Sequence, residues 1–466
     1  MRKTRFLTLA ASVTALALVV FLVVPGSEGE PVCADLVPTA PRQADLACVG
    51  RWIETEQSWP SGTREQATHA LAALSGEAAD LDDLELYVRL AALVALPDNG
   101  HTSLAVSPVY SQFGLVPLRT YWFDEGLFVS RATQEHRRLL GARVLEIAGQ
   151  TPEALMATMQ RYFGGPDEDF RVYGHEWFLS PALLAATGVS PSPDATAWRL
   201  ELTSGETVTL ELPPYVSDER HPGGYPWRQL HPAPLPREGD GWVSWLGEAG
   251  TEIPWAFDEP DRVFRYRFLA EASTAHIQLR SNISSGGEDI ADFQRSLKRH
   301  FKTDKPRFIV WDQRWNGGGD LTRTADFSRK LHEHLPPDGR VFVLTSNATF
   351  SAGIYTAFFP EWTNDERTTV VGTRVGDRER FWAETGPPIV LPETGWRIYY
   401  SLQLHDLADG CDESEPCHIR RDKWNMAVGS FDPEHRIGES SVELVAGRDT
   451  ALDWVLAEIG RQPPSP

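Results

Sequence analysis

The amino-acid sequence predicts an α/β fold for the C-terminal part of the chain, preceded by a helical segment and a small β domain. Residues 263–466 alternate between short runs rich in β-branched and aromatic residues and stretches that suit a helix. Such alternation is typical of a largely parallel sheet covered by helices. At 466 residues the chain is also too long for one small core, so two or three domains are expected.

The chain opens with the pattern of an export segment, which we assign to residues 1–29. Arg2, Lys3 and Arg5 precede an uninterrupted small and apolar run over 6–24. That run is long for a cleaved signal peptide and long enough to span a bilayer, so removal and retention as a membrane anchor both stay open. Either alternative places the bulk of the protein outside the cytoplasm, in the periplasm, the cell envelope or the medium.

Three segments with different patterns separate the export segment from the α/β core at 263–466. Residues 30–110 repeat apolar positions at three- and four-residue steps, which predicts a helical domain. Residues 111–214 carry strand-like runs, two of them joined by the hairpin signal TSGE, and predict a small β domain. Residues 215–262 are rich in Pro, Gly and Trp without a clear period, and we interpret them as an ordered but irregular linker.

The four cysteines form two local pairs along the chain. Cys33 and Cys48 bracket a short N-terminal segment, and Cys411 and Cys417 bracket an acidic loop. Two disulfides are expected in an exported chain. A metal site is the competing interpretation, and the spacing of the pairs does not support it.

The composition argues against several classes of partner. A formal net charge of −21 disfavours nucleic acid and anionic membrane surfaces, because both require clustered Lys and Arg. The two histidines of His332-Glu-His334 are too close together for the zinc pattern His-Glu-x-x-His. We therefore expect neither a metal nor a cofactor.

Two strand–loop–helix units in series carry the residues that suggest chemistry. The strand-like run 307–311 leads into DQRWNGGGD over 312–320, and the run 340–344 leads to TFSAG over 349–353. The first loop offers bare backbone amides, and Ser351 offers a hydroxyl among small neighbours, as acyl transfer requires. Each loop alone has a plainer interpretation, since glycines form tight turns and a serine can cap a helix. A phosphate-binding loop is disfavoured because the Lys-Ser/Thr ending is absent. The coincidence of both loops favours catalysis.

Several motifs in one order resemble a family of serine peptidases, which includes the tail-specific (C-terminal-processing) proteases and the core of tricorn protease. They are LVALPDNGHT from Leu93, LGARVLEIAG from Leu140, IVWDQRWNGGG from Ile309, LTSNATFSA from Leu344, VVG from Val370 and GRDTAL from Gly447. The resemblance implies a ClpP/crotonase-like parallel sheet with helices for the core, and a PDZ-like β domain for residues 111–214. It also implies hydrolysis of peptide or protein substrates.

The resemblance implies roles for individual residues. Ser351 matches the nucleophile, and the oxyanion would be held by the amide of Ala352 and by an amide at Gly318 or Gly319. The processing proteases take a lysine base from a Gly-Lys-Gly motif, but residues 372–378 read GTRVGDR here. An arginine cannot replace that lysine because it stays protonated.

The tricorn branch of the family uses a histidine base, and the resemblance puts His101 at the matching position. An imidazole suits this work because its unperturbed pKa lies near neutrality. A structural histidine at a helix end is the plainer interpretation. Gly100 stands where that branch has a serine, and the branch's acidic residue has no clear match. Glu384 and Asp406 are candidates for orienting His101, with surface solvation as the alternative for both.

The sequence therefore predicts an exported serine-type peptidase in which Ser351 attacks a peptide carbonyl with His101 as general base. One alternative is a peptide-binding protein that kept this scaffold and lost turnover. Another is an esterase-type serine hydrolase with the same machinery. The PDZ-like domain would bind a peptide end by strand addition.

Overall fold

The computed structural model describes residues 32–461, apart from 34, 38, 39, 107, 216–225, 236–240, 251, 385, 413, 419 and 420. The signal peptide or anchor predicted for residues 1–29, with its apolar run 6–24, lies outside the described residues. Among the residues that are described, no helix has the length and apolar character needed to cross a membrane.

A six-stranded sheet in the order β17-β12-β11-β10-β9-β8 forms the centre of the C-terminal half. Its strands are β8 (Phe264–Leu269), β9 (Thr274–Leu279), β10 (Phe308–Asp312), β11 (Arg340–Thr345), β12 (Thr368–Gly372) and β17 (His435–Arg436). Strand β8 is antiparallel to β9, and the other pairs are parallel. Nearly every residue of β9 to β12 is buried, as expected of parallel strands covered on both faces.

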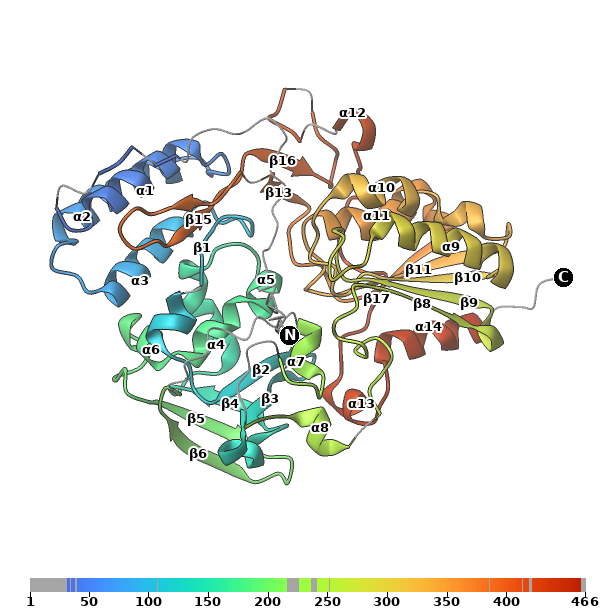
Figure 1. The fold of residues 1–466 in the computed structure, drawn as a ribbon, viewed down its shortest axis with the longest axis horizontal. Coiled ribbons are helices and arrows are strands. Elements are labelled where there is room, and N and C mark those ends of the chain that lie inside the picture. Colours follow the sequence, from blue (N-terminus) through green and yellow to red (C-terminus); the bar gives the residue numbers. More distant parts are fainter. Residues whose placement is uncertain are drawn as a thin grey trace, which may run out of the picture.

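Helices cover both faces of this sheet (Figure 1). One face carries α9 (Ile290–Asp304), α10 (Leu321–Ser328) and α11 (Ala352–Thr363), and the other carries α14 (Thr450–Arg461). Alternate residues of β10 divide between the two faces: Ile309 belongs to the α9–α11 side and Phe308 to the α14 side. The predicted mixed α/β core is confirmed.

Strands β10 and β11 end together, which brings their loops to one edge of the sheet. Asp312, the last residue of β10, is paired in register with Leu344 of β11. The glycine loop after β10 and the segment from Ser346 to Ser351 therefore leave the sheet side by side.

A second, antiparallel sheet lies beside the α/β core, in the order β2-β3-β4-β5-β6 with β7 paired to β3 (Figure 1). Its strands are β2 (Leu118–Phe123), β3 (Gly126–Thr133), β4 (Arg143–Ile147), β5 (Thr196–Glu201), β6 (Thr207–Leu212) and β7 (Trp242–Ser244). Helices α4 (Pro152–Met159), α5 (Asp167–Val172) and α6 (Pro181–Ala186) separate β4 from β5. The predicted hairpin joins β5 and β6, where Gly205 takes a φ of 84°.

Helices α1 (Gln43–Thr55), α2 (Thr63–Glu77) and α3 (Asp83–Val94) form the N-terminal part. Asp82 and Glu85 make a capping box at the start of α3. After α3, β1 (Ser103–Leu104) pairs with β15 (Arg397–Tyr399), which pairs with β14 (Ile389–Val390), so a segment of the C-terminal half returns to these helices. Figure 1 shows the orange β15 beside the blue helices.

One hydrophobic core runs through the helices and the second sheet, from Cys33 to Leu212. Five residues of the returning segment also belong to it: Ile389, Leu391, Trp396, Ile398 and Tyr400. The expected boundary between 30–110 and 111–214 thus runs through a continuous core, and the division into domains stays a prediction.

Short elements complete the chain. In the expected linker these are α7 (Pro226–Leu230), β7 and α8 (Trp245–Ala249). Near the C-terminal end they are β13 (Arg380–Ala383), its antiparallel partner β16 (Gln403–Asp406), α12 (Arg421–Trp424) and α13 (Ser441–Val445). Both predicted disulfides, Cys33–Cys48 and Cys411–Cys417, are present.

Candidate active site

Ser351 stands at the turn between β11 and α11 in a strained backbone conformation. Its φ is 55° and its ψ is −132°, a region that residues with a Cβ rarely adopt. Although Ser351 occupies the N-cap position of α11, its hydroxyl makes no capping hydrogen bond within the described chain. Capping, the plainer interpretation of this serine, therefore does not account for it.

The glycine loop packs directly against Ser351. A Cβ added to Gly318, whose φ is 95°, would stand 2.7 Å from the Cβ of Ser351 and 2.9 Å from the amide nitrogen of Ala352. A side chain at position 318 would collide with the backbone of the serine turn. The unusual dihedrals and the close approach explain why glycine is needed here, as the sequence suggested.

The amides around Ser351 differ in their availability. The Gly318 amide donates to Asn316 Oδ1 at 3.0 Å. The amides of Gly319 and Ala352 donate to no acceptor within the described residues. Of the two glycines left open by the resemblance, Gly319 thus has the uncommitted N–H.

Buried amide side chains join the two loops. Asn316 Nδ2 donates to Asn282 Oδ1 at 2.9 Å, and the Asn316 carbonyl accepts from the Phe350 amide at 3.0 Å. Asn282 in turn donates to the Ala352 carbonyl at 3.0 Å. Both asparagine side chains are fully buried, so these bonds hold the glycine loop and the serine turn in one register.

A buried ion pair fixes the start of the glycine loop. Arg314 donates to both carboxylate oxygens of Asp312 and to both of Asp449, just before α14. Burial alone would raise the pKa of Asp312, but Arg314 and His276 hold that pKa well below its usual range. The helix α14 is thereby tied to the carboxyl end of β10.

His101 reaches the serine turn from the N-terminal half of the chain. Its ring stacks on that of Phe350, the residue before Ser351, with 4.3 Å between the ring centroids. Phe381 stacks on the ring at 5.5 Å, and the two planes differ by 11°. His101 is 4 % exposed, so two aromatic rings hold a buried imidazole beside the serine turn.

Asp377 is the carboxylate that accompanies His101, and no motif in the sequence indicated it. Asp377 Oδ2 lies 3.3 Å from His101 Nδ1, and both side chains are buried. The angles do not complete a hydrogen bond, and within the described chain both imidazole nitrogens lack a hydrogen-bond partner. Asp377 belongs to the segment 372–378, which has no lysine at the position where the processing proteases carry theirs.

Arg378 ties the turn that carries His101 to the segment that carries Asp377. Its guanidinium donates to the Asp98 carbonyl at 2.6 Å, to the Asp98 carboxylate at 3.0 and 3.1 Å, and to the Gly165 carbonyl at 3.2 Å. Asn99 adds a second link, because its Oδ1 accepts from the Trp382 amide at 3.2 Å. Segments from three parts of the chain thus meet around the imidazole.

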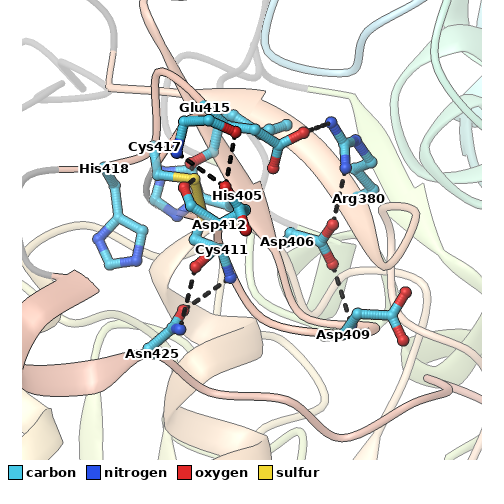
Figure 2. Close-up of a disulfide and its surroundings, with 12 residues drawn as sticks. Arg380, His405, Asp406, Asp409, Cys411, Asp412, Glu415, Cys417, His418 and Asn425 are labelled. Atoms are coloured by element: carbon cyan, nitrogen blue, oxygen red, sulfur yellow. Dashed lines mark hydrogen bonds and ion pairs between the residues drawn. A yellow bond between two sulfur atoms is a disulfide. The ribbon is translucent and has the colours of Figure 1, made fainter.

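The two acidic residues proposed from the sequence lie elsewhere. Glu384 Oε1 is 3.7 Å from His405 Nε2, and Asp406 accepts from Arg380 at 2.8 Å and from the Asp409 amide at 3.0 Å. Figure 2 shows Asp406 between Arg380 and Asp409, close to the Cys411–Cys417 disulfide. Within the described residues, Asp377 and not Glu384 or Asp406 is paired with His101.

Comparisons with known proteins bear on this fold. No protein-family model matches the chain. No curated protein matches it either. Among solved structures, mature CPAF complexed with lactacystin has a TM-score of 0.51 at 12% identity, over 90% of this chain and 97% of that one. A serine-to-alanine mutant of CPAF has a TM-score of 0.52 at 11% identity, over 90% of this chain and 98% of that one. The fold is similar to that of CPAF.

Another solved structure, the photosystem II D1 C-terminal processing protease, matches with a TM-score of 0.40 at 12% identity, over 91% of this chain and 98% of that one. The likeness to CPAF extends over the helices, the second sheet and the α/β core, since it covers most of both chains.

A further carboxyl group lies next to the His101–Asp377 pair. A Cβ on Gly100 would stand 3.5 Å from Oδ2 of Asp169, on α5. Burial and the nearby Asp377 raise the pKa of Asp169 well above its usual range. Asp169 therefore holds its proton more tightly than an exposed aspartate does.

Proposed function

We propose that the protein is a serine peptidase of the type found among its structural neighbours, with Ser351 as nucleophile and His101 as general base. The observation that carries the proposal is the stacking of the His101 ring on Phe350, which brings a buried imidazole to the strained serine turn. Asp377 at Nδ1 would orient the ring and leave Nε2 to take the serine proton.

The reaction follows the acyl-enzyme course. The Ser351 oxygen attacks the peptide carbonyl carbon while its proton passes to His101, and the oxyanion accepts from the amides of Ala352 and Gly319. The C–N bond then breaks as His101 returns the proton to the leaving amine. Water next attacks the ester, giving a proton to His101. The bond to Ser351 breaks, and the serine recovers its proton.

The finer parts of the proposal rest on the sequence. The β2–β6 sheet would be a PDZ-like domain that binds a peptide end, the core a ClpP/crotonase-like sheet, and the protein would act outside the cytoplasm. Two disulfides support that location, because they persist in oxidising compartments.

Labelling with a fluorophosphonate probe, followed by mass spectrometry, tests the proposal. We expect modification of Ser351 in the wild type, none in Ser351→Ala, and labelling at least about 100-fold slower in His101→Ala. Identification of the products from a peptide library separates a peptidase from an esterase. A wild type that neither reacts with the probe nor cleaves any peptide would support the alternative of a binding protein without turnover.

A further inference from the structure

A cavity of about 290 Å³ lies between the second sheet and the α/β core, beside the proposed active site. Residues of β2, of α5 and of the segment 346–348 that leads to Ser351 line it. Tyr173 also lines it, and the Tyr173 hydroxyl is 4.0 Å from the point where a Cβ on Gly317 would stand. The cavity therefore adjoins the glycine loop. Its volume is near the lower end of ligand pockets, about 300 to 1,000 Å³, and suits a side chain of a bound peptide.

The lining carries more acidic than basic side chains. The acidic ones are Asp124, Asp167, Glu168, Glu176 and Glu439, and the basic ones are Arg171, Arg374, Arg436 and His175. Burial lowers the pKa of His175 to about 4, so that this imidazole is neutral at physiological pH.

Two of the three guanidinium groups are already neutralised. Arg436 pairs with Asp124 at 2.5 Å. Arg374 is bonded to Glu379 at 2.7 Å and to Asp432 at 3.0 Å, which lie outside the lining, and pairs more distantly with the lining residue Glu168 at 3.8 Å. The cavity thus presents a surplus of negative charge to a ligand, which favours a cationic guest.

One carboxylate oxygen of Glu439 can accept a hydrogen bond from a ligand. Tyr121 donates to its Oε2, while Oε1 is buried and has no hydrogen-bond partner in the described part of the chain. A buried carboxylate oxygen without a donor is uncommon. Burial raises the pKa of Glu439 to about 7, against the opposing effect of Arg314, so a cation that enters would readily hold the group ionised.

We propose that this cavity is a specificity subsite for a lysine or arginine side chain of the peptide substrate, with Glu439 as its acceptor. The inference rests on the proposed peptidase function and adds a substrate class to it. A peptide whose scissile carbonyl lies at Ser351 would place a neighbouring side chain beside Tyr173. The long stem of lysine or arginine would cross the aromatic lining of Tyr121 and Trp122 and carry the charge to the carboxylates.

The experiment compares kcat/KM for peptides that carry lysine, arginine, norleucine or glutamate at each position around the scissile bond. At one position we expect the cationic peptides to be cleaved about 10-fold or more faster than the norleucine peptide, as a charge-assisted hydrogen bond would provide. Glu439→Gln should reduce this ratio to about threefold or less. The exposed Asp167→Asn should reduce it in part.

Glu361→Gln is the matched control. Burial also raises the pKa of Glu361 to about 7, and its Oε2 is buried without a hydrogen-bond partner in the described chain, but Glu361 does not line the cavity. We expect this variant to keep the wild-type preference. The same preference in Glu439→Gln and in the wild type would overturn the assignment to Glu439, and cleavage without any preference for a cation would overturn the subsite.

A binding experiment keeps the subsite separate from the proposed chemistry. In the Ser351→Ala variant, fluorescence anisotropy should show tighter binding of a lysine peptide than of its norleucine counterpart, and Glu439→Gln should remove the difference. If the wild type fails to react with the fluorophosphonate, the peptidase proposal fails, while these affinities still decide the subsite. Equal affinities for the two peptides would end the inference.

Discussion

At the scale of single residues, Asp377 is the group that would orient His101 in the proposed mechanism. An acid at Nδ1 keeps one tautomer of the imidazole and stabilises the imidazolium that forms when the serine proton moves. Asp377 lies beside His101 Nδ1, where Glu384 or Asp406 was expected. Those two carboxylates pair instead with His405 and Arg380. The side chain that orients a catalytic histidine must be found from distances, because its place in the sequence is not constrained.

We expect Asp377→Asn to slow fluorophosphonate labelling of Ser351 by about 100-fold or more, because the imidazole loses its orienting charge. Asp406→Asn is the matched control, since it neutralises an acid that is paired with Arg380 and lies away from His101. Rates of labelling at several pH values measure the effect. Equal rates in both variants would remove Asp377 from the mechanism.

Glu361 allows a prediction about stability and pH. Burial, together with Glu434 and Asp365, raises the pKa of Glu361 to about 7 from 4.5, so the folded state holds a proton that the unfolded chain has released. Stability therefore falls as the pH rises from about 4.5 to about 7, and the loss is complete above that range. After allowance for its partial exposure, the cost at pH 8 is about 1 to 2 kcal/mol.

Glu361→Gln should therefore be more stable than the wild type by about that amount at pH 8 and equally stable at pH 4. Urea unfolding at both pH values measures this difference. A stabilisation that is the same at both pH values would show that packing, and not the titration of Glu361, is its cause.

At the scale of elements, His101 lies on the turn that follows α3, and Arg378 binds that turn to the segment that carries Asp377. The turn and Asp377 come from opposite halves of the chain, so their separation depends on the contacts of Arg378 with Asp98 and Gly165. A surface ion pair of this kind contributes little to stability, about 0 to 1 kcal/mol. Its effect on the placement of an imidazole can be much larger.

Arg378→Ala should slow fluorophosphonate labelling about 10-fold or more while the midpoint of thermal unfolding changes by only a few degrees. Arg380→Ala, which removes the pairs with Asp406 of β16 and with Glu415, is the control and should label at the wild-type rate. If the labelling rate of Arg378→Ala falls only in proportion to its loss of folded protein, Arg378 is structural and does not position His101.

Local patterns in the sequence predicted the strands and helices of the α/β core, because a covered parallel sheet imposes continuous apolar runs. They also predicted that the glycine loop and the turn at Ser351 leave the sheet at one edge, while the role of Ser351 stays a prediction. The pairing of β1 with β15 was not predictable, since strands of two and three residues leave no periodic signal and the two strands lie far apart in the sequence. The commitment of the Gly318 amide to Asn316 likewise depends on a turn geometry that composition does not reveal.

At the scale of the whole molecule, a segment of the C-terminal half joins the hydrophobic core of the N-terminal half. Residues such as Trp396 and Ile398 complete the core of the N-terminal helices and the second sheet, and the Cys33–Cys48 disulfide lies in the same cluster. A variant that destabilises the N-terminal part should therefore also unfold the surroundings of Ser351, the residue that the fluorophosphonate labels.

The Cys33→Ser/Cys48→Ser variant should lose about 3 kcal/mol, because its disulfide spans a separation of 15 residues. The Cys411→Ser/Cys417→Ser variant, with a separation of 6, should lose about 2 kcal/mol. Urea unfolding followed by tryptophan fluorescence and by labelling of Ser351 measures both. A shift in fluorescence without any shift in labelling would show that the two halves unfold independently.

The order in which a ribosome makes the chain gives the Arg314–Asp449 pair a further consequence. Asp449 is synthesised long after His101, Ser351 and the glycine loop, yet it supplies both acceptors for one side of Arg314. Until it emerges, Arg314 lacks the carboxylate of Asp449, and the glycine loop beside Ser351 lacks its final brace. A nascent chain that lacks Asp449 should thus hold the glycine loop less firmly than the full chain does.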